Sequence, residues 1–87
     1  MSIEIKYTAE FIGLYGKLEN DLQIEVKEKI ELFKDHKNHT QSKVHKLHGR
    51  FNGYLSFSID YKNRILFKYT AKNTATLLIV GDHDIYR

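Results

Sequence analysis

Two absences restrict the possible functions of this 87-residue sequence, which contains no cysteine and no long apolar run. Without cysteine the chain can form neither a disulfide framework nor a thiolate zinc site. Without a long apolar run it has no candidate membrane span, and its N-terminus shows no signal-peptide pattern. We therefore expect a soluble, cytoplasmic protein that does not interact with a membrane.

The remaining composition is that of one small folded domain. Hydrophobic residues make up 41% of the chain, and the six Tyr and five Phe among them argue against disorder. This supply is enough for one core and not for two. Because no internal repeat, linker, proline or low-complexity segment interrupts the chain, we expect a single domain over residues 1–87.

Charge is distributed unevenly along the chain. Residues 1–33 hold four Lys and seven Asp or Glu, which gives a net charge of −3. Residues 34–87 hold ten Lys or Arg and four Asp, which gives +6, together with all five histidines. Clustered basic charge is typical of phosphate binding, so the second part of the chain is expected to contact a polyanion such as a nucleic acid.

The first part of the chain predicts a strand followed by a helical hairpin. Residues 3–7, IEIKY, alternate apolar and charged side chains, which is typical of a half-buried strand. Thr8 can cap the first helix, and Glu19–Asp21 form a turn and a second cap before a helix at about residues 22–34. The apolar stripes that face the core are Phe11, Leu14, Tyr15 and Leu18, and then Leu22, Val26, Ile30 and Phe33.

Two glycines, Gly13 and Gly16, lie within the first helix. Glycine in a helix interior costs roughly 1 kcal/mol relative to alanine. We expect that the missing side chains let the neighbouring helix approach closely.

The second part predicts several strands after a polar loop. Residues 35–43 contain no apolar side chain and are expected to form a loop, and residues 44–54 a short strand or extended segment with a turn. Side chains alternate between two faces in the strands expected at 54–61 and 64–70. Residues 76–80, TLLIV, are apolar on both faces, which is typical of an interior strand covered on both sides.

The hairpin between residues 54–61 and 64–70 can pair in two registers. A two-residue loop would place Tyr61 opposite Arg64 and mix apolar and basic side chains on one face. A three-residue loop places Asp60 opposite Arg64 and keeps the two kinds apart, so we predict this register. The core face then carries Leu55, Phe57, Ile59, Ile65, Phe67 and Tyr69, and the other face carries Ser56, Ser58, Asp60, Arg64 and Lys68.

These elements predict an α+β fold with the order β-α-α-β-β-β. The helical hairpin packs on one face of a small, mostly antiparallel sheet. The other face stays open and carries serine, arginine, lysine and histidine side chains.

The basic second part of the chain has the residue types that a metal-independent ribonuclease needs. The histidine pairs 36/39 and 45/48 lack the further ligands of a metal site, and no phosphate-binding loop or hydrolase motif is present. Cleavage by the 2′-OH of RNA needs only a base, an acid and cations around the phosphate, and no cofactor. The candidates are His45, Lys46, His48, Arg50, Arg64, Lys68, His83, Tyr86 and Arg87.

Residues 44–87 resemble the second half of the RelE/ParE superfamily of bacterial toxins, with the RelE/StbE and YafQ-like mRNA interferases as the most similar members. The first half is similar in layout only. No single motif is specific, but their order and spacing are. The motifs are Leu47-His48-Gly49, Gly53-Tyr54, the strand-opening Arg64, the apolar strand 77–80, Gly81-Asp82-His83, and an ending with Asp84 and Tyr86.

The resemblance implies a RelE-like fold and the toxin of a type II toxin-antitoxin system. Such a toxin is a metal-independent, ribosome-dependent endoribonuclease that cleaves mRNA and inhibits translation. It needs no cofactor, and a cognate acidic antitoxin neutralises it. The alternatives are a gyrase-inhibiting toxin of the ParE type, against which the Gly-x-His ending argues, and a non-catalytic member that only binds its antitoxin.

The resemblance also implies roles for individual residues. His83 and His45 correspond to an acid/base pair, and the two aspartates beside His83 favour its protonated form, which suits a general acid. Arg64 corresponds to a residue that holds phosphate, and Tyr86 to the terminal aromatic of the site. YafQ-like toxins have a further histidine where this chain has Ser58, which cannot act as a base at neutral pH. The remaining RNA and phosphate contacts are Lys46, His48, Arg50, Lys68 and Arg87.

Overall fold

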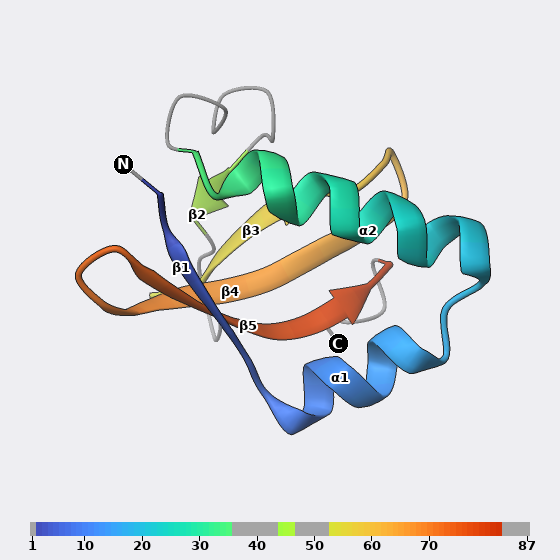
Figure 1. Ribbon diagram of the computed structural model, residues 1–87, viewed down its shortest axis with the longest axis horizontal. Helices are drawn as coiled ribbons and strands as arrows, with labels where there is room; N and C mark the ends of the chain where they lie inside the picture. Colours follow the sequence, from blue (N-terminus) through green and yellow to red (C-terminus); the bar gives the residue numbers. More distant parts are fainter. Residues whose placement is uncertain (1, 36–43, 47–52, 83–87) are drawn as a thin grey trace.

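The chain folds into helices and strands in the order that the sequence predicts (Figure 1). The computed structural model describes residues 2–35, 44–46 and 53–82. The elements within these ranges are β1 (Glu4–Tyr7), α1 (Ala9–Gly16), α2 (Asn20–Phe33), β2 (His45–Lys46), β3 (Leu55–Ser58), β4 (Arg64–Ala71) and β5 (Thr74–Gly81). Neither of the two helices is long and apolar enough to cross a membrane.

The strands form one mixed sheet in the order β1-β5-β4-β3-β2. β1 pairs in parallel with β5, and the other pairings are antiparallel. β5 therefore lies between β1 and β4, which confirms the interior position predicted from its apolar sequence. Cover on both faces was predicted as well, but Leu78 and Ile79 are only half-buried among the described residues. The two-residue β2 lies at the far edge, within residues 44–54, for which a short strand or extended segment was predicted. It is a fifth strand, whereas the predicted order has four.

α1 and α2 both pack on one face of the sheet, as predicted (Figure 1). The centre of this core is a cluster of three phenylalanines, all fully buried. The ring of Phe33 from α2 stacks on Phe57 of β3 with centroids 4.4 Å apart, and it meets Phe67 of β4 edge-on at 4.8 Å. Such aromatic pairs add to the apolar area that they bury, so this cluster attaches α2 to the middle of the sheet.

Thr8 joins the start of α1 to β5. Its hydroxyl accepts a hydrogen bond from the backbone N–H of Phe11 at 3.0 Å, which confirms the predicted cap. The same hydroxyl lies 3.2 and 3.1 Å from the carbonyl oxygens of Leu77 and Leu78. Its backbone N–H also donates to Leu77. Thr8 thus follows β1, caps α1 and holds the start of this helix against β5.

The predicted apolar stripes of both helices face the core. Four of their residues are buried, and the others are half-buried against the core cluster. α2 begins at Asn20, two residues earlier than predicted, and its N-cap residue Glu19 makes no capping hydrogen bond with its side chain. The helices are joined instead by Tyr15 and Gln23, where each side chain donates a hydrogen bond to the other residue's carbonyl oxygen.

The β3–β4 hairpin corrects the predicted register. Ser58, and not Asp60, lies opposite Arg64, so the loop spans the five residues 59–63. The Asp60 carboxylate closes this wider loop by accepting hydrogen bonds from the backbone N–H groups of Lys62 at 2.8 Å and Asn63 at 2.6 Å. A shift of two residues preserves the two faces, so the predicted division into an apolar and a polar face is correct.

The prediction for the two glycines of α1 is wrong. Within the described part of the chain, a β-carbon at Gly13 or Gly16 would meet no heavy atom within 4 Å apart from the backbone of its own helix and its chain neighbours, and both residues are exposed. No neighbouring helix therefore needs the space that these glycines leave.

We expect Gly13→Ala to raise the free energy of unfolding by about 0.5–1 kcal/mol, because alanine restricts the unfolded chain and fits the open space. Thermal unfolding followed by circular dichroism should show a melting temperature higher by roughly 2–8 °C. Gly53→Ala is the matched control and should destabilise, because Gly53 has a φ of 93° that alanine adopts with strain. An unchanged or lower melting temperature for Gly13→Ala would contradict this account.

The Asp60 loop predicts a pH-dependent contribution to stability. Burial acts to raise the pKa of Asp60, but hydrogen bonds from Asn63 and Lys62 outweigh it and lower the pKa below its ordinary value of 3.8. A carboxyl whose pKa falls on folding stabilises the protein above its unfolded pKa, and this stability is lost as the pH falls through the folded pKa.

Asp60→Ala should therefore lower the free energy of unfolding by about 1 kcal/mol at pH 7. The difference from wild type should shrink as the pH falls below about 4. Urea unfolding at a series of pH values measures this difference. Asp60→Asn keeps an acceptor oxygen without the titrating group and serves as the control. A deficit of the alanine variant that is equal at neutral and acidic pH would exclude the carboxylate as its cause.

Candidate functional site

The open face of the sheet carries the polar residues that the sequence analysis assigned to it. On β4, Arg64, Leu66 and Lys68 alternate with the core residues Ile65 and Phe67. Strand pairing places Ser58 and Ser56 of β3 opposite Arg64 and Leu66. Because side chains of paired residues share a face, Ser56, Ser58, Arg64 and Lys68 all lie opposite the helices.

Arg64 occupies the centre of one row across this face. Its partners are Ser58 on β3 and Gly81 on β5, so a serine and a glycine lie on either side of Arg64 in the sheet. No described residue forms an ion pair with Arg64, and the nearby Asp60 carboxylate binds its own loop. β5 ends at Gly81, two residues before His83 in the sequence. The arginine is thus a half-exposed cation at the end of β5.

Lys68 forms a second polar cluster on the same face. Its ammonium nitrogen lies 5.6 Å from the centre of the Tyr54 ring, which is within the range of a cation–π contact. Thr76 pairs with Lys68 across β5, and its hydroxyl lies 2.9 Å from that of Thr70. Lys68 and Arg64 are four residues apart on one strand, or about 13 Å. Ser56 and Leu66, which lie between the two clusters, are buried.

The structure brings some of the predicted site residues together and separates others. Arg64 and Lys68 share the open face. The backbone of His45 lies opposite Ser56, which belongs to that face. Lys46 pairs with Leu55 and so shares the opposite face, the one with the core, at the edge of the sheet. The predicted site residues His48, Arg50, His83, Tyr86 and Arg87 lie outside the described residues.

The structure shows the neighbours of two residues that the sequence analysis did not assign to the site. Ser58, noted as the replacement of a histidine, pairs directly with Arg64. Tyr54 was assigned to the open face but not to the site, and its contact with Lys68 now places it there. The sequence pattern that could have indicated Tyr54 was its alternation with Ser56 and Ser58, which places it on the same face. That pattern could not show which basic residue of the next strand lies beside Tyr54.

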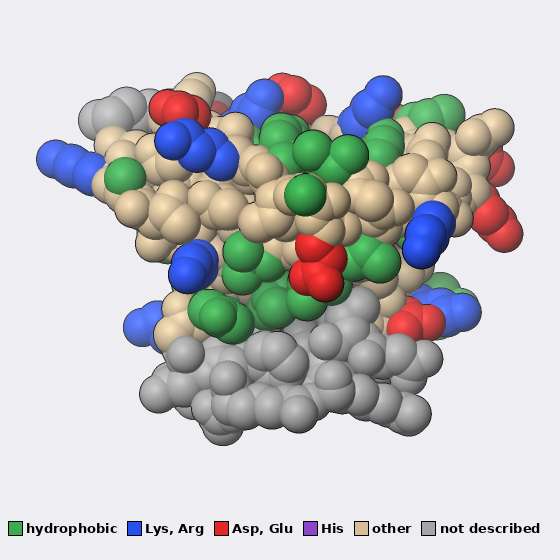
Figure 2. Space-filling model, turned by 90° about the horizontal axis from the view of Figure 1, so that it is seen from below, with side chains coloured by type: hydrophobic (Ala, Val, Ile, Leu, Met, Phe, Trp, Pro, Cys, Tyr) green, Lys and Arg blue, Asp and Glu red, His purple; other side chains and the backbone are tan. Residues whose placement is uncertain are grey.

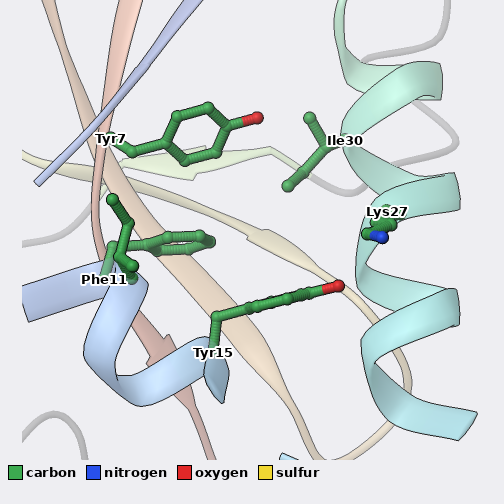
Figure 3. Close-up of a pocket in the computed structure, with 6 residues that line it drawn as sticks. Tyr7, Phe11, Tyr15, Lys27 and Ile30 are labelled. Carbon is green, nitrogen blue, oxygen red and sulfur yellow. The ribbon is translucent and has the colours of Figure 1, made fainter. Parts of the chain in front are cut away.

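A separate groove of about 230 Å³ lies on the helix side of the sheet, between β1, α1 and α2 (Figure 3). Its lining residues are Tyr7, Phe11, Ile12, Tyr15, Lys27 and Ile30. The rings of Tyr7 and Phe11 have centroids 5.5 Å apart, and the hydroxyls of Tyr7 and Tyr15 point toward α2 (Figure 3). Lys27 is the one charged residue in this lining, so the groove suits apolar groups and offers no acid/base pair.

One view of the surface shows where hydrophobic and basic side chains gather. A view from below shows hydrophobic side chains across the middle of the molecule, with most lysine and arginine side chains around its margins (Figure 2). Ile12 in the groove lining is 59% exposed and Tyr7 is 47% exposed. The groove lining is therefore a partly exposed apolar patch, and the candidate site for a polyanion is the open face around Arg64 and Lys68.

Comparisons with known proteins identify the fold. No family model matches the chain, and no curated protein matches it in sequence. Solved structures do match. The chain is similar to YafQ from E. coli, with a TM-score of 0.78, 16% identity and coverage of 97% of both chains. It is also similar to a chain of the RelBE2 toxin-antitoxin complex of Mycobacterium tuberculosis, with a TM-score of 0.77, 18% identity and coverage of 95% of this chain and 100% of that one.

A third solved structure, the E. coli DinJ-YafQ toxin-antitoxin complex, gives a TM-score of 0.75 at 17% identity and covers 98% of this chain and 97% of that one. At such low identity the likeness shows the fold. The chain therefore has the RelE-like α+β fold that the resemblance of residues 44–87 predicted. The match also extends over the first half, for which the sequence showed a similar layout only.

Proposed function

We propose that this chain is the toxin of a type II toxin-antitoxin system and cleaves mRNA without a metal ion. The observation that carries the proposal is the half-exposed Arg64 on the sheet face opposite the helices, beside the end of β5, in a fold similar to that of RelE- and YafQ-type toxins. Cleavage of mRNA would inhibit translation. The mRNA and the ribosome are cytoplasmic, so the toxin would act in the cytoplasm.

The proposed reaction is attack by a ribose 2′-OH on the adjacent phosphorus. The 2′-oxygen loses its proton to a base and forms a bond to phosphorus. The bond to the 5′-oxygen breaks, and this oxygen takes a proton from an acid. The products are a 2′,3′-cyclic phosphate and a 5′-hydroxyl. The phosphate gains charge in the transition state, and a fixed cation beside it lowers the barrier. Arg64 would supply that cation.

His45 and His83 are the proposed base and acid. His45 lies two strands and one row away from Arg64, about 10 Å across the sheet and about 7 Å along it. β5 ends opposite Arg64, and His83 follows two residues later in the sequence. Asp82 and Asp84 flank His83 and favour its protonated form, which suits the acid that protonates the leaving oxygen. Tyr86 would stack on a base or position a proton.

Further basic residues would bind parts of the RNA that lie outside the cleaved bond. Lys68 lies on the open face about 13 Å from Arg64 along β4. Lys46 lies at the edge of the sheet on the face of Leu55, so it would reach RNA from that edge. His48, Arg50 and Arg87 complete the proposed set. The ribosome would orient the mRNA in the site, so isolated RNA should be cleaved slowly.

The proposed protein partner is an acidic antitoxin. Two of the similar structures are toxin-antitoxin complexes, RelBE2 and DinJ-YafQ. In this chain residues 34–87, which include the open face, carry a net charge of +6. An acidic chain laid over this face would neutralise its charge and block access of RNA to Arg64.

The test is to induce the wild-type chain and His83→Ala in bacteria and to map mRNA 5′ ends. Removal of the proton donor should reduce cleavage by about a hundredfold or more and relieve growth arrest. Retained binding of the antitoxin would show that the variant is folded. Unchanged mRNA cleavage in His83→Ala would refute the proposed role of His83.

Growth arrest without mRNA cleavage would refute the endoribonuclease. If such arrest came with DNA damage, it would indicate the gyrase-inhibiting alternative. Antitoxin binding without any arrest would indicate a non-catalytic member of the fold.

Ser58→His tests whether the position opposite Arg64 belongs to the reaction centre. A histidine there would add a second titratable base beside the guanidinium, so we expect a higher rate of mRNA cleavage and a pH dependence near the pKa of histidine, about 6.5. Ser58→Gln is the matched control of similar size without a titratable group. Equal cleavage rates and pH profiles for the two variants would show that this position does not take part.

A further inference from the structure

We infer that Tyr54 and Lys68 form a nucleotide subsite on the open face, separate from the Arg64 centre, in which the tyrosine ring stacks on a base and the ammonium group binds a phosphate. This inference rests on the proposed function in that it takes RNA as the ligand of the open face.

The first support is geometric. Tyr54 directly precedes β3, and Lys68 lies on the neighbouring strand β4 with its ammonium nitrogen 5.6 Å from the ring centre. Both side chains are half-exposed, so a ligand can reach them without unfolding the sheet. A cation and an aromatic ring side by side match the two parts of a nucleotide, its phosphate and its base.

A phosphate can replace the Tyr54 ring as the partner of the Lys68 ammonium group. A cation–π contact at a partly solvated site is weak, whereas the hydrogen bond of an ammonium group to a phosphate is charge-assisted. A phosphate can therefore draw Lys68 away from the ring. The ring face that the ammonium leaves becomes available to a base, and stacking on tyrosine tolerates any of the four bases.

The distance from Arg64 makes this a second subsite and not a part of the first. Lys68 and Arg64 lie about 13 Å apart along β4. The residues between them on this face, Ser56 and Leu66, are buried and carry no charge. The Lys68 ammonium group lies over the Tyr54 ring, so Lys68 would hold a nucleotide at some distance from the bond that is cleaved.

The neighbouring strand adds hydrogen-bonding groups to the subsite. Thr76 of β5 pairs with Lys68, and its hydroxyl is bonded to that of Thr70 at 2.9 Å. Thr70 is exposed, and hydroxyl groups can both donate to and accept from a ribose 2′-OH or a base edge. The subsite thus combines stacking, charge and hydroxyl groups within adjacent strands.

The test measures binding of the purified full chain to a 2′-O-methyl RNA dodecamer, which lacks the attacking hydroxyl, by fluorescence anisotropy at 50–200 mM salt. Tyr54→Ala should weaken binding by about fivefold or more without changing its salt dependence, because stacking carries no charge. Tyr54→Phe should bind as wild type. Lys68→Gln should weaken binding and reduce the slope of log affinity against log salt by about one.

Matched controls exist within the chain. Tyr61 is 92% exposed in the β3–β4 loop, and Lys72 is exposed in the β4–β5 turn. Tyr61→Ala and Lys72→Gln remove the same groups away from the subsite and should leave the affinity within about twofold of wild type. Thermal unfolding of each variant shows whether it is folded at the assay temperature.

The outcomes separate this inference from the proposed reaction. If Tyr54→Ala binds RNA as tightly as Tyr61→Ala, or if the wild-type chain does not bind the dodecamer, the subsite is refuted even where mRNA is cleaved in cells. If Tyr54→Ala weakens binding while the wild type cleaves no mRNA, the subsite stands and the reaction is refuted. Loss of antitoxin affinity without loss of RNA affinity would assign Tyr54 to the antitoxin and overturn the inference.

Discussion

The stacking of Phe33 on Phe57 is the interaction on which the rest of the structure depends. It attaches α2 to β3, and the edge-on contact of both rings with Phe67 extends the attachment to β4. Because side chains alternate along a strand, burying Phe57 and Phe67 under the helix turns Ser58 and Lys68 to the other face. The polar face is therefore a consequence of the apolar core, and a change that reversed one would reverse both.

The two faces of the sheet suit different ligands. The helix side holds an apolar groove in which Lys27 is the one charged group among the lining residues, beside two tyrosines, a phenylalanine and two isoleucines. The open side holds the half-exposed cations Arg64 and Lys68. The apolar groove and the two cations thus lie on opposite sides of the same sheet.

The β3–β4 hairpin shows why the sheet face of a residue is easier to predict than the residue that pairs with it on the next strand. The face depends on the alternation of many side chains, each of which is stabilised by burial in the core. The partner depends on the loop, where the carboxylate of Asp60 binds two backbone N–H groups and favours five residues over three. One local interaction thus moved the register by two residues and placed Ser58, instead of Asp60, beside Arg64.

The sequence by itself determined the α+β class, the two apolar helix stripes, the cap at Thr8 and the polar face with Arg64 and Lys68, because these follow from local periodicity. Its resemblance to RelE-like toxins also predicted the fold. Tertiary structure alone decided that β1 lies parallel beside β5, that Lys46 shares a face with Leu55, that Gly13 faces open space and that Tyr54 lies beside Lys68. These features depend on which distant segments pack together. Which distant segments pack together depends on burial over the whole core, so it cannot be predicted from local periodicity.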